Sequence, residues 1–95
     1  MYLPSQMKQS IVKILEEGGV SHAALFGSFA RGDASKDSDV DLLIEFQGKD
    51  KSLLDLAALK IRLEEDLGRH VDLLTYNSLH PLLKNRILSE QVVIL

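Results

Sequence analysis

The residues best suited to chemistry lie in one short block in the first half of the chain. The block begins with Gly27 and Ser28, continues through Arg31 and ends at the acid pair Asp39 and Asp41. A Gly-Ser pair where a strand enters a helical turn exposes backbone N–H groups and lets an anion approach closely, so it is a candidate phosphate seat. The block is not a P-loop, because no Gly-Lys-Ser/Thr follows, and it lacks the Gly-x-Ser-x-Gly spacing of a nucleophile elbow. The same pair is also common at ordinary turns, so the acids must decide between these interpretations.

The spacing of the acids favours a cation site. Asp39 and Asp41 stand at i and i+2 of a predicted strand, which places them about 6.6 Å apart on one face, where both can reach the same hard cation. Asp72 lies in a later predicted strand with the same alternation, and it reaches this face if the two strands are neighbours. A solvated polar face is the alternative for each acid alone. Together with the Gly-Ser pair, the three acids suit metal-dependent phosphoryl transfer, in which no covalent nucleophile is required.

The elements that must position these residues follow from hydrophobic periodicity. Helical spacing predicts helices within residues 5–18, 53–68 and 77–88, and alternating or apolar runs predict strands at residues 21–26, 39–46, 71–75 and 92–95. We expect Ser5 to cap the first helix and Asn77 or Ser78 to cap the last, with Pro81 tolerated in its first turn. This order predicts one α/β domain over residues 1–95, with a mixed sheet, helices packed mainly on one side and the acid face open.

The composition limits the function. A chain of 95 residues holds one core, and the absence of cysteine removes thiolate zinc sites and cysteine nucleophiles. The net charge of -3 disfavours strong direct binding to nucleic acid. No apolar stretch approaches the roughly 20 residues of a membrane span, and the N-terminus lacks the pattern of a signal peptide, so we expect a cytoplasmic protein without membrane attachment.

The run GSFARG, six further residues and then DVD resembles the nucleotidyltransferase superfamily typified by DNA polymerase beta. Because the chain is short, it is most similar to the minimal nucleotidyltransferase (MNT) family, whose members often act as antitoxins to HEPN-family ribonuclease toxins. The resemblance implies a small nucleotidyltransferase fold in which Gly27 and Ser28 contact the nucleotide phosphates. Arg31 matches the arginine of the GSxARG form of the motif and joins the nucleotide-binding set. Its guanidinium could steady phosphate or balance the acid cluster.

The same resemblance implies roles for the acids and for a partner. Asp39 and Asp41 match the metal-binding acids, and Asp72 matches a third acid that activates the attacking hydroxyl or holds a second metal. Mg²⁺ is the implied cofactor and ATP the implied donor, with AMP transferred to a hydroxyl, such as that of tyrosine, on a HEPN toxin. Because so short a chain has no room for an acceptor domain, we expect a hetero-oligomer with that toxin. The alternative is a module that neutralises the toxin by covering it, with the motif idle.

The remaining titratable residues have no recognisable motif. His22, His70 and His80 lack metal-ligand spacing, so structural or surface roles are expected. The acidic run at residues 64–66 is expected to form a solvated helix end. Glu45 shares the face of the acid pair but lies further along its strand, so we do not expect it to be a ligand.

Overall fold

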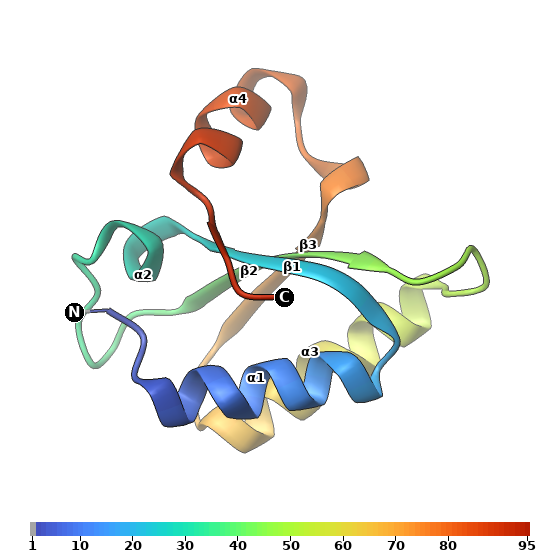
Figure 1. The fold of residues 1–95 in the computed structure, drawn as a ribbon, viewed down its shortest axis with the longest axis horizontal. Coiled ribbons are helices and arrows are strands. Elements are labelled where there is room, and N and C mark those ends of the chain that lie inside the picture. The colour runs from blue at the N-terminus through green and yellow to red at the C-terminus, as the bar shows by residue number, and fades with distance from the viewer. Residues whose placement is uncertain (1) are drawn as a thin grey trace.

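The computed structural model describes residues 2–95 and places a four-stranded sheet at the centre of the molecule (Figure 1). The strands are β1 (Val20–Phe26), β2 (Val40–Phe46), β3 (Val71–Thr75) and β4 (Val92–Val93). They are ordered β3-β2-β1-β4. β1 runs antiparallel to both β2 and β4, whereas β2 and β3 are parallel. The mixed sheet predicted from the sequence is therefore confirmed, with the last strand at a sheet edge.

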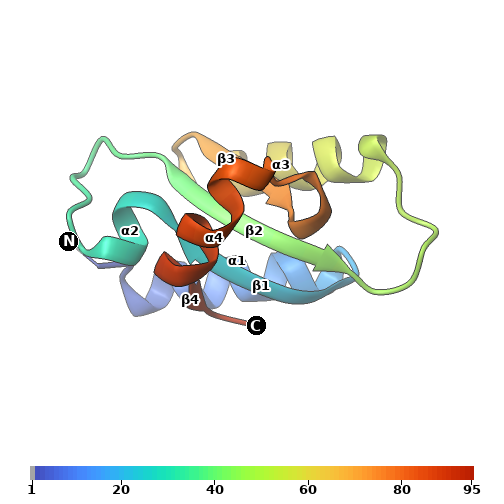
Figure 2. The same cartoon turned by 90° about the horizontal axis from the view of Figure 1, so that it is seen from above.

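The helices lie on both faces of the sheet. They are α1 (Ser5–Glu17), the short α2 (Gly27–Arg31), α3 (Leu53–Leu67) and α4 (Pro81–Glu90), and a 3-10 turn, η1 (Tyr76–Ser78), follows β3. α1 and α3 lie side by side under one face, and α4 stands over the other (Figure 1). Seen from above, α4 lies across β1 and β2 (Figure 2). No helix within residues 2–95 is long and apolar enough to cross a membrane.

The main core fills the space between the sheet and the pair α1 and α3. Its fully buried large aliphatic side chains come from both helices and from β2: Ile11, Leu15, Val40, Leu42, Ile44 and Leu63. α3 is the crossover between the parallel strands β2 and β3, and its packing under the sheet holds them side by side. This packing fixes the register on which the acid cluster depends.

The opposite face is packed more lightly. Ala24 and Leu43 are buried there, as is Leu79 just before α4, but no residue within α4 itself is buried. Leu82 and Leu83 on α4 are 85% and 50% exposed. Helices are thus packed mainly on one side, as expected, and α4 adds a partial cover on the other.

The caps of two helices differ from the sequence predictions. Ser5 is the first residue of α1 rather than its cap, because Pro4 occupies the cap position and its carbonyl accepts the N–H of Lys8 at 2.9 Å. Proline suits this place because its φ is already restricted to helix-compatible values. The prediction of Ser5 as the N-cap is therefore wrong by one residue.

The last helix also begins later than predicted. Asn77 and Ser78 belong to η1, where the Ser78 hydroxyl donates to the Thr75 carbonyl at 2.9 Å. His80 caps α4 instead, with its Nδ1 accepting from the N–H of Leu82 at 3.1 Å. An unprotonated histidine nitrogen can replace the usual serine or aspartate oxygen as a capping acceptor. The expected structural role of His80 is confirmed, whereas the predicted caps are wrong.

Candidate active site

The turn from β1 into α2 requires glycine at its first position. Gly27 has φ +70, in the left-handed region that other residues rarely adopt. A Cβ at this position would collide with the carboxylate of Asp41. The glycine therefore lets the backbone of the turn lie directly against the acid strand. The carbonyl of Ser28 closes the short helix α2, because it accepts the N–H groups of Gly32 at 2.9 Å and of Asp33 at 3.1 Å.

Strand pairing gathers the acids at one end of the sheet. Asp41 lies opposite Asp72 in the parallel ladder of β2 and β3, and opposite Phe26 in the antiparallel ladder with β1. Asp39 stands directly before β2, which begins at Val40, one residue later than predicted. The condition that the acid-bearing strands be neighbours is thus met. Asp39, Asp41 and Asp72 are called the acid row below. The end of β1, where the Gly-Ser turn begins, lies on the side of this row opposite Asp72.

The environment of Asp41 opposes its ionisation. Partial burial and the nearby charges of Asp72 and Asp39 raise the pKa of Asp41 from 3.8 to about 6, and a hydrogen bond with Asp72 adds to the effect. The positive charge of Arg31 opposes this change in the pKa of Asp41, but it is the smallest contribution. Negative charge is therefore concentrated at this point, and a bound cation would relieve the repulsion.

The donor set fits a hard divalent cation that is shared with a phosphate. Asp41 and Asp72 are paired, whereas Asp39 acts on Asp41 through its charge. Within residues 2–95, no three carboxylate or imidazole side chains already form a cage for an ion. Mg²⁺ commonly uses one or two carboxylates and completes its shell with water and substrate phosphate oxygens. The two paired carboxylates, with Asp39 nearby, suit such a partial site.

Arg31 is engaged by carboxylates that the sequence analysis did not connect with it. Its Nε donates to Asp33 Oδ2 at 3.2 Å and its Nη1 donates to Glu90 Oε2 at 3.4 Å. These two partners raise the pKa of Arg31, with Asp33 the larger influence. The role of Glu90 at the end of α4 was missed, because the two residues are 59 positions apart and no local pattern links them.

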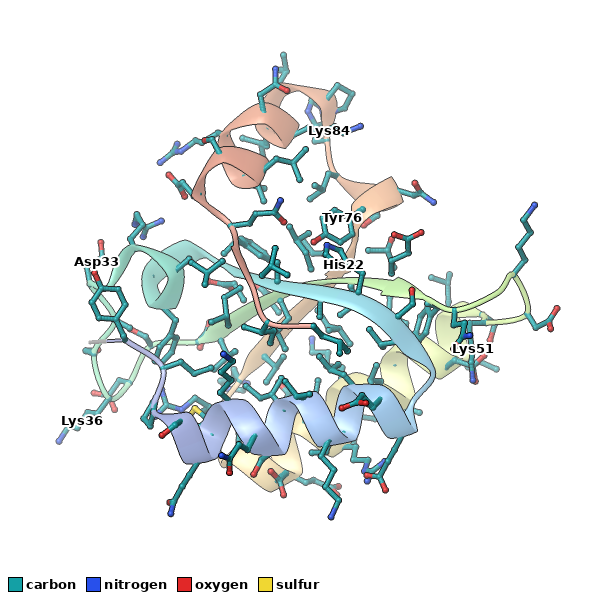
Figure 3. All side chains as sticks on the ribbon, in the orientation of Figure 1. His22, Asp33, Lys36, Lys51, Tyr76 and Lys84 are labelled. Carbon is teal, nitrogen blue, oxygen red and sulfur yellow. The ribbon has the colours of Figure 1, made fainter. Side chains whose placement is uncertain are left out.

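His22, Tyr76 and Glu45 lie away from the acid row. Figure 3 shows His22 and Tyr76 close together on the face that α4 overlies, and their rings are stacked with centroids 5.4 Å apart. Glu45 pairs with His22 in the ladder, four positions beyond Asp41, so its expected distance from the acid row is confirmed.

Glu64 does not belong to a solvated helix end. It accepts the N–H of Val71 at 3.0 Å and lies 3.4 Å from Nδ1 of His70. The expectation for residues 64–66 is therefore wrong at Glu64, because the end of α3 lies beside the start of β3 and supplies an acceptor for its first N–H.

Comparison with known proteins agrees with this arrangement. Residues 8–94 match the family model described as nucleotidyltransferase domain. "Putative protein adenylyltransferase MJ0435" of Methanocaldococcus jannaschii is 55% identical over 91 residues, which span 96% of this chain and 97% of that protein. "Protein adenylyltransferase MntA" of Thermococcus cleftensis is 39% identical over 82 residues, covering 86% of this chain and 82% of the relative.

Solved structures share the fold. "Structure of putative minimal nucleotidyltransferase" is 36% identical with a TM-score of 0.80, covering 93% of this chain and 89% of that one. A toxin-antitoxin crystal structure with AMP-PNP has a TM-score of 0.80 at 21% identity, covering 93% and 72% of the two chains. The fold is that of a nucleotidyltransferase. The chain belongs to the nucleotidyltransferase domain family, as one of its minimal members. The family, fold and enzyme class expected from the sequence are confirmed.

Proposed function

We propose that this protein is a Mg²⁺-dependent enzyme that transfers AMP from ATP to a hydroxyl group of a HEPN-family ribonuclease toxin, and that it acts as the antitoxin. The observation that carries the proposal is the placement of the Asp41 carboxylate, which lies against Gly27, while its residue lies opposite Asp72 in the parallel ladder of β2 and β3. Phosphates held at the Gly-Ser turn would meet the carboxylates at the same point. Nucleotidyl transfer requires the phosphates and the metal-binding carboxylates to be held next to each other in this way.

Each residue of the cluster has a role in this proposal. Gly27 and Ser28 receive the triphosphate through the backbone of the turn, with the Ser28 hydroxyl as a further donor. Asp39, Asp41 and Asp72 supply the oxygen ligands for Mg²⁺. When bound, Mg²⁺ neutralises the charge that develops on the phosphate oxygens. The chain itself therefore contributes position and charge rather than a nucleophile.

The transfer is a single displacement at the α-phosphorus of ATP. The acceptor hydroxyl oxygen forms a bond to that phosphorus, the bond from the phosphorus to the oxygen bridging the β-phosphate breaks, and pyrophosphate leaves. Asp72 accepts the hydroxyl proton, because it is the carboxylate on the exposed edge strand of the cluster. The product is an AMP phosphodiester on the acceptor.

Two findings support a protein acceptor. The curated relatives are named as protein adenylyltransferases. One structural neighbour, with a TM-score of 0.75 at 18% identity, is described as a tri-AMPylated Shewanella oneidensis HEPN toxin in complex with MNT antitoxin. We propose a tyrosine hydroxyl as the acceptor and a hetero-oligomer with the toxin as the functional assembly.

The test uses a HEPN-family ribonuclease toxin as the candidate acceptor. A small molar fraction of the present protein is added with ATP and Mg²⁺, and the intact mass and ribonuclease activity of the toxin are followed. Each transfer should add one AMP to the toxin mass, and ribonuclease activity should fall even though the antitoxin is substoichiometric. Removal of Mg²⁺ with a chelator should stop both changes.

The control separates catalysis from simple covering. The double change Asp39→Asn and Asp41→Asn should abolish transfer, whereas Asp50→Asn, in the exposed loop after β2, should retain it. If protection instead requires equimolar protein, persists in the double variant and leaves the toxin mass unaltered, the protein is a binding module that neutralises its partner by steric contact.

A further inference from the structure

Two consecutive residues at the end of α4 hold other parts of the fold. Glu90 pairs with Arg31 at the end of α2 at 3.4 Å. The side chain of Gln91 accepts a hydrogen bond from the Tyr76 hydroxyl at 2.9 Å, and Tyr76 directly follows the strand that carries Asp72. The end of α4 thus connects the far end of α2 with the 3-10 turn that follows β3.

These ties matter because α4 has few other restraints. It has no buried residue, and its first turn exposes Leu82 and Leu83. Its contacts with the rest of the fold are mainly with α2 and β1. A helix with so little buried apolar surface depends on polar contacts for its exact placement.

α2 is equally dependent on its neighbours. It has only five residues, from Gly27 to Arg31, and it is too short to be stable alone. Phe29 is its only buried residue, and the carbonyl of Ser28 closes it by accepting two backbone N–H groups. The orientation of the Gly-Ser turn therefore depends on what holds the far end of this helix, where Arg31 lies.

We propose that Glu90 is a positioning residue, and that Arg31 serves nucleotide binding through Glu90 by fixing α2 against α4 rather than by touching the phosphates. This inference rests on the proposed function, in which the Gly-Ser turn receives the triphosphate. It assigns a place in the site to α4, which carries none of the motif residues. It gives Arg31 a positioning role in addition to its charge effect on Asp41.

The contacts of Arg31 support this assignment. Its guanidinium is held by Asp33 on one side and Glu90 on the other, so two of its donor groups already have carboxylate partners. Glu90 is also 3.5 Å from Nε of Arg86, one helical turn earlier, which orients its carboxylate. Direct contact with a phosphate would have to use the remaining N–H donors of the guanidinium, while Nε and Nη1 stay with Asp33 and Glu90.

Binding of AMP-PNP with Mg²⁺, measured by titration calorimetry, tests the coupling. Arg31→Gln and Glu90→Gln should each weaken binding by about three- to fivefold, as expected for a partly exposed ion pair. The double variant should bind no worse than either single one, because both remove the same connection. Arg31→Lys, which keeps a cation opposite Glu90, should retain more affinity than Arg31→Gln. The control is Glu65→Gln, an exposed acid on α3, which should leave affinity unchanged.

The opposite pattern overturns the inference. If Arg31→Gln weakens binding while Glu90→Gln does not, or if the two effects add, Arg31 contacts the nucleotide directly. A second measurement does not depend on the nucleotide at all. Hydrogen exchange at the amides of Gly32 and Asp33, which close α2, should become faster in Glu90→Gln and remain unchanged in a Glu65→Gln control on α3. Absence of nucleotide binding in the unmodified protein would refute the proposed function, whereas unchanged exchange in Glu90→Gln would refute the positioning role.

Discussion

Replacing Asp41 by asparagine should stabilise the fold while it removes a metal ligand. The carboxylate of Asp41 is partly buried beside two other acids, and these surroundings raise its pKa to about 6. Asparagine has nearly the same shape, carries no charge and can still donate a hydrogen bond to Asp72. The variant therefore keeps the packing of the site and loses the repulsion.

The size of the effect follows from linkage between the pKa and folding. At about 1.4 kcal/mol for each pKa unit, raising the pKa from 3.8 to about 6 costs the folded state about 3 kcal/mol at neutral pH. Asp41 is only half-buried, so solvent screening reduces this figure, and we expect a gain of about 1 to 2 kcal/mol in Asp41→Asn. For a domain of this size, that corresponds to a rise in Tm of about 4 to 15 °C.

The sign of the pH dependence distinguishes this cause from a general packing effect. The folded state binds the Asp41 proton more tightly than the unfolded state, so the cost is absent below about pH 4 and fully present above about pH 6. The advantage of Asp41→Asn should therefore appear between pH 4 and pH 6 and remain constant above that range. Thermal unfolding followed by far-UV circular dichroism, at several pH values without divalent ions, measures it.

Added Mg²⁺ should reverse the order of stability. Ligand binding to the folded state stabilises the unmodified protein and not the variant, so the difference in Tm should shrink or change sign as Mg²⁺ rises. Asp50→Asn, in the exposed loop after β2, is the control and should change Tm little at any pH. The reasoning is refuted if Asp41→Asn is less stable than the unmodified protein at pH 7.5 without Mg²⁺, or if its advantage is the same at pH 4 and pH 7.5.

Three further predictions concern the turn, a strand start and the core. Gly27→Val should weaken AMP-PNP binding at least tenfold, because a side chain there would displace Asp41 and the φ of +70 is strained for valine. Ser28→Ala should weaken AMP-PNP binding by less than about fivefold, since it removes only a hydroxyl. If calorimetry gives similar affinities for the two variants, the assignment of the turn as the phosphate site is wrong. The hydrogen bond from Val71 is the main influence that lowers the pKa of Glu64, so its stabilising effect is present above the unfolded-state pKa and is lost as pH falls through the folded-state value. The urea midpoint of Glu64→Gln should consequently drop less than that of the unmodified protein between pH 7 and pH 3, and an equal drop would contradict this role. Leu63→Ala, at a fully buried position, should cost about 2 to 5 kcal/mol, whereas Leu82→Ala on the exposed side of α4 should change stability by less than about 0.5 kcal/mol; urea unfolding that ranks the two in the opposite order would contradict the described core.

Local periodicity predicted the elements whose signals are self-contained. α3 ends at Leu67 before Gly68, and β3 covers residues 71–75, both as the sequence indicates. Their apolar spacing and the glycine after the helix act within a few residues of the chain, so no tertiary information is needed. Caps were less predictable, because a proline carbonyl and a histidine nitrogen served where serine or asparagine was expected.

The sequence predicted the acids of the candidate site but not the residues that hold its elements in place. The alternation of Asp72 showed which face it would occupy, and only the parallel pairing of β2 and β3 brought it beside Asp41. Arg31 was recognised from its motif, but its partner Glu90 depends on where α4 lies in space. Such a contact leaves no periodic trace in the sequence, since any exposed acid at the end of a helix looks the same.

The chemistry is confined to one end of the sheet, which has a practical consequence for labelling. The acids stand at the starts of β2 and β3, and the glycine turn stands at the end of the antiparallel strand β1. All of them therefore lie at the same end of the sheet. The loop after β2 lies at the opposite end of the sheet. Residues 47–50 are exposed there, and a side chain added at Gly48 would meet open space. Because the chain has no cysteine, Lys49→Cys would give a single attachment point for a fluorophore. Association with a partner could then be followed in solution without modifying the residues of the site.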